Sequence, residues 1–204
     1  MLKIFGHPMS TCTRKVLMTL AENGTPHEMN LVDFAKGEHK AQPHLGRQPF
    51  GQIPAIDDDG FAFFESRAIC RYLNEKVSGK LVPSDLKERA LMEEWISVET
   101  SNFTPHAMKF IYHYTFKRTQ EDAVLAAAAT SLDTAFSVME ARLTKTPYLA
   151  GDQFTLADLF FMPYLEYGMG SPIKEQLAKY PHVSAWWNKV SERPTWQKTA
   201  GRPS

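Results

Sequence analysis

Residues 6–14 read Gly-His-Pro-Met-Ser-Thr-Cys-Thr-Arg and place three hydroxyls and one thiol between an expected strand and an expected helix. The strand covers residues 2–5, and the helix covers residues 13–23, where apolar residues share one face before the stop signal Asn23-Gly24. At such a junction, free backbone N–H groups and the helix dipole favour an anion by ~0.3–1 kcal/mol. The stretch therefore indicates an anion or thiolate site, although Ser and Thr are also ordinary helix caps.

The rest of the first half alternates strands with one further helix. Strands are expected at residues 27–32, 53–57 and 61–65, and the last two flank the hairpin turn signal Asp58-Asp59-Gly60. Ser66 then opens a helix that runs to about residue 76. The order β-α-β-loop-β-β-α predicts an α/β fold with a mixed four-stranded sheet.

The second half contains only helical patterns. Thr155 and Asp158 form the signature of a capping box, and the following residues to about Tyr167 are apolar nearly all round. That helix is therefore expected at the buried centre of a helical bundle. The other helices are expected at residues 85–114 (bent or broken at Pro105), 121–144, 173–179 and 182–193.

A composition change separates the two halves. Gly79 and Pro83 suit a linker, so we expect an α/β domain at residues 1–77, a linker at 78–86 and an all-helical domain at 87–204.

The overall composition excludes several classes of protein. The 204 residues carry 23 basic and 23 acidic side chains, which argues against a nucleic-acid binder and against a polybasic membrane anchor. Two cysteines cannot build a disulfide framework or a four-cysteine zinc site, and they favour a reducing cytoplasm. The N-terminal residues turn polar too soon for a signal peptide, and the most apolar stretch, 154–167, is too short to span a bilayer.

Three further segments carry polar groups at expected strand or helix ends. Residues 38–40 (Glu-His-Lys) lie in a polar, irregular stretch that covers residues 36–45. Pro54 stands near the start of a strand, and Glu65 and Ser66 stand at the start of a helix. Each segment alone has an ordinary explanation, as a solvated loop, an edge proline or a helix cap.

Together these segments resemble the glutathione transferases, specifically the plant-type phi class. The matching stretches are FGHPMSTCTRKVLMTL, GEHK, PFGQIPAI and FFESRAICRYL in the first half, and YLAGDQFTLADL and ERPTWQK in the second. The resemblance covers essentially the whole chain. It implies a thioredoxin-like N-terminal domain, a C-terminal helical bundle and a homodimer in which Phe50 and the helix from Ser66 to Tyr72 are interface elements.

The resemblance also implies residues that bind glutathione. Ser10 matches the catalytic serine, whose hydroxyl donates a hydrogen bond to the glutathione sulfur. His39 and Lys40 match residues near the glycyl carboxylate, and Gln52 matches a side-chain ligand of the peptide.

Four more positions match the remaining parts of the glutathione site. Ile53 offers its backbone N–H and C=O to the cysteinyl part, and Pro54 matches the cis-proline that shapes this backbone. Glu65 takes the γ-glutamyl ammonium and Ser66 takes the α-carboxylate, and a helix N-terminus is suited to a carboxylate.

The implied activity is attack of the glutathione thiolate on a small hydrophobic electrophile. The electrophile is expected between the domains, against an apolar wall of Met9, Phe34, Met108, Ile111 and Tyr112. Glutathione is a co-substrate, and neither a cofactor nor a metal is implied. Two alternatives stay open: a glutathione-dependent peroxidase, isomerase or thiol lyase, and a non-catalytic carrier or scaffold on the same fold.

The cysteines do not match a disulfide oxidoreductase. Related families with a reactive cysteine generally carry it at the Ser10 position, and Thr13 stands where the second cysteine of a C-x-x-C pair would be. Cys12 is therefore expected as a small buried residue that faces the sheet, and Cys70 as a core residue. Arg14 is expected to support the site, to pair with an acid or to lie on the helix surface.

Overall fold

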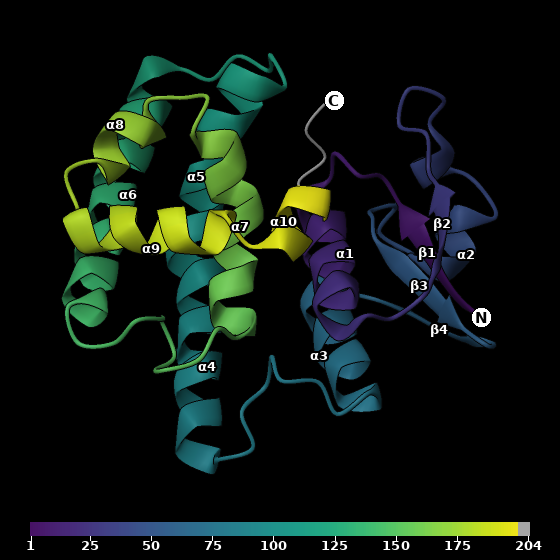
Figure 1. Ribbon diagram of the computed structural model, residues 1–204. Coiled ribbons are helices and arrows are strands. Elements are labelled where there is room, and N and C mark those ends of the chain that lie inside the picture. Colours follow the sequence, from purple (N-terminus) through teal and green to yellow (C-terminus); the bar gives the residue numbers. More distant parts are fainter. Residues whose placement is uncertain (200–204) are drawn as a thin grey trace. The chain divides into compact units, whose positions relative to one another are not determined.

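The computed structural model describes residues 1–199 and divides them into two compact units (Figure 1). The first unit holds residues 1–80 together with residues 194–199, and the second is Leu81–Arg193. The sequence prediction placed residues 194–199 in the helical domain, whereas their helix α10 (Pro194–Thr199) packs against α1 (Thr11–Asn23). Residues 200–204, which the predicted helical domain also includes, lie outside the described residues.

The first unit is built on the predicted mixed four-stranded sheet. Its strands are β1 (Leu2–Gly6), β2 (Glu28–Leu31), β3 (Ala55–Asp58) and β4 (Phe61–Phe64), in the order β2-β1-β3-β4. β1 is parallel to β2 and antiparallel to β3, which is antiparallel to β4. β3 begins two residues after its expected start because Pro54 has no N–H to donate to the ladder.

Helices cover both faces of this sheet. α1 and α3 (Ser66–Lys76) contact each other on one side, and Figure 1 shows α2 (His44–Arg47) on the other. The alternation of β1 agrees, since Leu2 and Ile4 are buried while Phe5 lies under the Arg47 guanidinium at 4.0 Å.

The cysteine predictions have different outcomes. Cys70 is fully buried in α3, as expected, and burial raises the pKa of its thiol to about 12. Cys12 is only partly buried, so the expectation of a buried residue is wrong for it. The reason is that α1 begins at Thr11, which puts Cys12 in the first turn, where its neighbours Thr11 and Thr13 take the buried positions.

The second unit is helical throughout its regular elements, as predicted. α7 (Leu156–Gly168) is buried at every position from Leu156 to Leu165 and lies at the centre. The other helices are α4 (Leu86–Val98), α5 (Thr104–Phe110), α6 (Asp122–Leu143), α8 (Ile173–Leu177) and α9 (Pro181–Ser191). Within residues 1–199, no helix has the length and apolar character needed to cross a membrane.

The predicted helix over residues 85–114 is interrupted in a way that the sequence did not indicate. Two π-helical turns, at Glu99–Phe103 and Ile111–Thr115, flank α5. Pro105 falls in the first turn of α5, where its missing N–H costs no intrahelical hydrogen bond. The chain therefore accommodates Pro105 by changing helix type just before it.

Asp158 connects three parts of the second unit. Its carboxylate accepts backbone hydrogen bonds from Thr155 (3.0 Å) and Leu149 (3.0 Å) and one from the Trp186 indole of α9 (2.9 Å). The bond to Thr155 completes the predicted capping box of α7. Burial raises the pKa of Asp158, and these hydrogen bonds oppose that rise.

Replacing Asp158 with Ala is expected to lower the free energy of unfolding by about 3 kcal/mol or more, because several buried donors lose their acceptor. Urea unfolding followed by circular dichroism measures the change. Asp152→Ala removes an exposed acid from the preceding turn and is expected to stay within about 0.5 kcal/mol of the parent protein. Equal losses in the two variants would contradict the assignment.

Candidate functional site

The strand register brings one terminus of each of the four strands to the same edge of the sheet. This edge is the one that runs across the strand termini. Gly6 pairs with Leu31, and Phe5 pairs with Ala55, which also pairs with Phe64. β1, β2 and β4 therefore end at the edge where β3 begins. The loop before Ser10, the Ile53-Pro54 segment and the Glu65-Ser66 pair consequently lie at the same edge, as the sequence prediction requires.

The loop that carries Ser10 is held by its own short hydrogen bonds. The Ser10 N–H donates to the His7 carbonyl at 2.9 Å, and the Arg14 Nε donates to the Pro8 carbonyl at 2.8 Å. Ser10 also caps α1, because its Oγ accepts the Thr13 N–H at 3.2 Å. Among residues 1–199, no acceptor engages the Ser10 O–H, which leaves it available as a donor. Arg14 is 2% exposed, which excludes the expectation of a surface cation.

The Lys40 side chain and the His39 backbone pack closely around Gly51. The Lys40 Nζ donates to the Phe50 carbonyl at 2.8 Å, and two of its protons remain for a ligand. A Cβ on Gly51 would lie 2.6 Å from the Lys40 Cδ and 2.7 Å from the His39 carbonyl. Gly51 also has a φ of +61°, so both the space and the backbone require glycine here.

The His39 ring is fixed by its surroundings. It stacks on Phe34 with 4.1 Å between ring centroids. Its Nδ1 is buried and has no hydrogen-bond partner among the described residues. Contact with a ligand would therefore run through Nε2.

The backbone of Gln52 is held from both sides while its side chain is exposed. The Gln48 Oε1 accepts the Gln52 N–H at 3.0 Å, and the His44 Nε2 lies 2.7 Å from the Gln52 carbonyl oxygen. The following Ile53–Pro54 bond is cis, as expected. Within residues 1–199, no hydrogen bond engages the backbone N–H or C=O of Ile53.

Glu65 and Ser66 take different environments at the start of α3. Glu65 is exposed and has φ 74° and ψ 102°, a region that non-glycine residues rarely adopt and that often marks ligand contacts. Ser66 is buried at the first position of α3, where backbone N–H groups have no helical partner. The pair offers a carboxylate beside a helix N-terminus, a combination that suits a ligand with both charges.

The five residues predicted to line the electrophile site lie in both units. Met9 and Phe34 are exposed on the first unit. In the second unit, Met108 and Tyr112 are partly exposed, while Ile111 is 1% exposed and packs in the interior. Their role as substrate contacts stays a prediction.

His44 and Gln48 were missed by sequence reasoning, and Arg14 was left with several roles. α2 has only four residues and overlaps the end of the stretch predicted as irregular, residues 36–45, so no periodicity could reveal it. The sequence feature that comes nearest to indicating His44 and Gln48 is their contact residue Gln52, which directly precedes Ile53, the expected backbone ligand.

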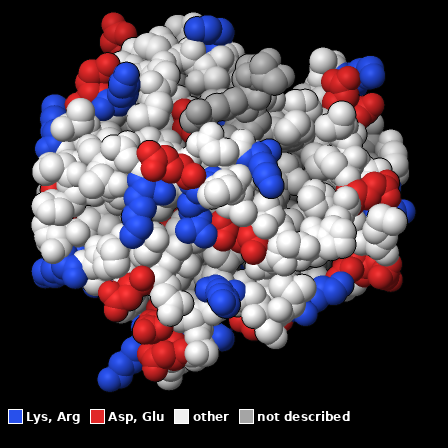
Figure 2. All heavy atoms as spheres, in the orientation of Figure 1, with Lys and Arg blue, Asp and Glu red and all other residues white. Residues whose placement is uncertain are grey.

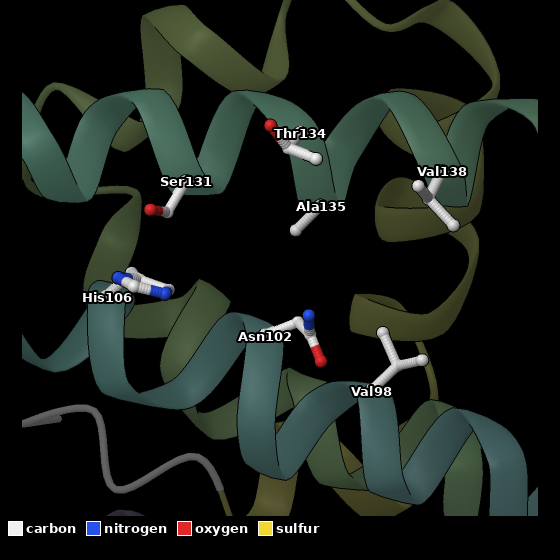
Figure 3. A pocket seen from close by; sticks show the side chains of 7 residues that line it. All are labelled: Val98, Asn102, His106, Ser131, Thr134, Ala135 and Val138. Carbon is white, nitrogen blue, oxygen red and sulfur yellow. The ribbon is translucent and has the colours of Figure 1, made fainter.

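The second unit contains a pocket of about 280 Å³. Figure 3 shows that the side chains of α6 face those of the helix that runs from α4 through α5. The lining residues are Val98, Asn102, His106, Ser131, Thr134, Ala135 and Val138. The face of the molecule seen in Figure 2 carries positive and negative side chains interspersed with one another, in agreement with the net charge of zero.

The fold and the site define a two-unit protein with a thioredoxin-like sheet unit and an all-helical unit. Residues 1–75 match the family described as glutathione S-transferase, N-terminal domain, and residues 103–194 match its C-terminal domain. The chain belongs to the glutathione S-transferase family. It is thus an enzyme of a family that uses glutathione as co-substrate.

The relatives confirm the resemblance to plant phi-class enzymes. Glutathione S-transferase F6 of Arabidopsis thaliana is 38% identical over 97% of this chain and 98% of its own. The crystal structure of glutathione transferase F7 from Populus trichocarpa has a TM-score of 0.93 at 38% identity, covering 98% of both chains. Glutathione S-transferase I from maize, in complex with an atrazine glutathione conjugate, has a TM-score of 0.91 at 37% identity, covering 98% of this chain and 96% of its own.

Gly51→Ala is expected to raise the glutathione dissociation constant about tenfold, because a Cβ there displaces His39 and Lys40. Calorimetric titration measures the constant. Gly60→Ala is the matched control, since Gly60 also has a positive φ but nothing lies within 4 Å of its added Cβ. If both variants bind glutathione like the parent protein, the packing around Gly51 does not shape the site.

Proposed function

We propose that the enzyme conjugates the glutathione thiolate to small hydrophobic electrophiles and that Ser10 stabilises the thiolate. The observation that supports the proposal is that the Ser10 hydroxyl caps α1 through its oxygen. Its oxygen already accepts the Thr13 N–H, so its proton is the group left for a sulfur anion at the end of the sheet. The N-terminus of α1 adds its dipole at the same place.

The hydrogen bond from Ser10 and the dipole of α1 can supply the free energy needed to ionise the glutathione thiol. A thiol with a reference pKa near 8.5 must lose about 2 pKa units to be ionised at neutral pH, which requires ~2.7 kcal/mol. A hydrogen bond to a charged acceptor supplies ~1.5–3 kcal/mol, and the helix dipole adds ~0.3–1 kcal/mol. Ser10 and the start of α1 are therefore sufficient without a general base.

The remaining residues of the sheet edge suit the rest of glutathione. Glu65 and Ser66 would hold the γ-glutamyl ammonium and carboxylate. The free backbone groups of Ile53 would pair with the cysteinyl part, with Gln52 alongside. His39 and Lys40 would hold the glycyl carboxylate, where Lys40 keeps two unused protons.

The electrophile is proposed to be a small apolar molecule. Of its five predicted contacts, Ile111 is too buried to touch a ligand, and Met9, Phe34, Met108 and Tyr112 stay the proposed ones. The maize relative, whose structure contains an atrazine glutathione conjugate, supports this substrate class. A detoxifying role is part of the proposal, since conjugation makes apolar electrophiles water-soluble. The cytoplasm is the proposed location because the two cysteines favour a reducing compartment.

Ser10→Ala is expected to raise the pKa of the bound glutathione thiol and to slow conjugation at neutral pH by about ten- to hundredfold. The reason is the loss of the hydrogen bond to the thiolate. The rate of conjugation should then rise at a higher pH than in the parent enzyme, because less thiolate is present at neutral pH. Thiolate absorbance and rates with a halogenated aromatic substrate are measured across pH.

A second variant separates the chemistry from the helix cap. Asp85→Ala removes the cap of α4, whose carboxylate accepts from Lys87 and Glu88, and costs a comparable ~1 kcal/mol of stability. It should leave the thiol pKa and the rate unchanged. Unchanged pH dependence in Ser10→Ala would exclude the role of Ser10, and turnover of organic hydroperoxides without conjugation would favour a peroxidase.

The enzyme is also proposed to be a homodimer. Phe50 is 66% exposed and precedes the proposed glutathione-binding residues Gln52 and Ile53 in the chain, separated from them only by Gly51. Phe61 is also exposed and lies on the edge strand β4. The pocket of the second unit has apolar walls from Val98, Ala135 and Val138. A phenyl ring of a second copy is its proposed occupant, and a twofold axis would use Phe50 and the pocket twice.

Phe50→Ser and, on the pocket side, Val138→Arg are expected to shift the protein from dimer to monomer, because each removes an apolar contact that is used twice. Sedimentation velocity at micromolar concentration measures the change. Leu86→Ser is the control, since Leu86 is an apolar residue that is 78% exposed elsewhere on the chain. A monomeric parent protein would contradict the proposal.

A further inference from the structure

Two consecutive peptide groups before Ile53 are held by the segment around α2. The Gln52 N–H, which belongs to the Gly51–Gln52 peptide, donates to the Gln48 Oε1 at 3.0 Å. The Gln52 C=O, which belongs to the Gln52–Ile53 peptide, lies 2.7 Å from the His44 Nε2. Gln48 and His44 are both buried, whereas Gln52 is exposed, so the two contacts are part-buried.

The hydrogen bond to the Gln52 carbonyl determines which ring nitrogen of His44 carries a proton. A carbonyl oxygen only accepts hydrogen bonds, so the proton must be on Nε2. The His44 Nδ1 is buried and has no hydrogen-bond partner among the described residues. The bond to Gln52 is therefore the polar contact that orients this ring, which is 3% exposed.

The planarity of the peptide group carries this contact to the other side of the chain. The Gln52–Ile53 bond is trans, because the two cis bonds found in the described chain are Gln42–Pro43 and Ile53–Pro54. In a trans peptide the C=O and the N–H point in opposite directions. Fixing the Gln52 oxygen toward His44 thus fixes the Ile53 N–H away from it. A hydrogen bond to the oxygen also polarises the peptide and strengthens its N–H as a donor.

We propose that His44 is a positioning residue for glutathione: by holding the Gln52 carbonyl, it aims the Ile53 N–H at the cysteinyl part of the ligand. This inference rests on the proposed function of Ile53. His44 does not touch glutathione itself, and it acts on binding rather than on the thiolate, which Ser10 stabilises.

The test compares three substitutions at His44 by glutathione affinity, kcat and a backbone resonance. His44→Phe keeps a buried ring without a donor, and His44→Asn places its amide too close to its own backbone to reach the carbonyl. Both should raise the glutathione dissociation constant about tenfold, while kcat at saturating glutathione and the bound thiol pKa stay unchanged. His44→Gln can place its amide N–H near the position of Nε2 and should bind within about threefold of the parent enzyme.

The amide nitrogen resonance of Ile53 reports the hydrogen bond without any ligand. It should shift in His44→Phe and His44→Asn and stay near its parent position in His44→Gln. His27→Phe replaces an exposed histidine of the same unit and should change neither the affinity nor the resonance.

The outcomes separate the two proposals. Parent-like affinity in His44→Phe or His44→Asn, or equal weakening in all three variants, would overturn the role of His44, because the donor would then not matter. A fall in kcat with unchanged affinity would also overturn it. Absence of glutathione binding by the parent enzyme would instead overturn the proposed function, whatever the variants do. If His44→Phe does not fold, the comparison of His44→Asn with His44→Gln decides.

Discussion

The antiparallel pairing of β3 with both β1 and β4 is the constraint on which the site depends. Because Ala55 pairs with Phe5 and with Phe64, the start of β3 lies between the ends of its two neighbours. A slip of one residue would turn each side chain of β3 to the opposite face of the sheet. Ala55 and Ile56 are both buried, on opposite faces, so a slip would exchange a small and a large side chain between two packed faces. The hydrophobic core therefore helps to set the spacing of the polar groups at the edge.

Part of the candidate site is backbone, and buried side chains hold that backbone in place. Arg14 holds the loop before Ser10, and His44 and Gln48 hold Gln52. The conformational entropy of these loops is therefore lost on folding and not on ligand binding. Ser10 caps α1 with its hydroxyl oxygen, and the proposed bond to the thiolate would use the proton of the same hydroxyl, which would link the stability of α1 to the activity.

Sequence reasoning was most successful where periodicity and caps are local. The helix from Ser66 to Lys76 and the capping box at Thr155 were predicted from neighbouring residues and are present. α2 was missed because four residues have no periodicity, and the π turns around α5 were missed because they depend on packing. The candidate site residues came from resemblance of motifs, whereas the side chains that hold them came only from the three-dimensional contacts.

The docking of α10 has a consequence for synthesis of the chain. Trp196 is fully buried, α10 packs against α1, and the Thr195 hydroxyl donates to Glu22. During translation, residues 1–80 leave the ribosome long before α10 exists, so the surface of α1 that α10 covers is bare at that stage. Of the two units, the one built on the sheet therefore begins to emerge before the helical unit and is completed after it.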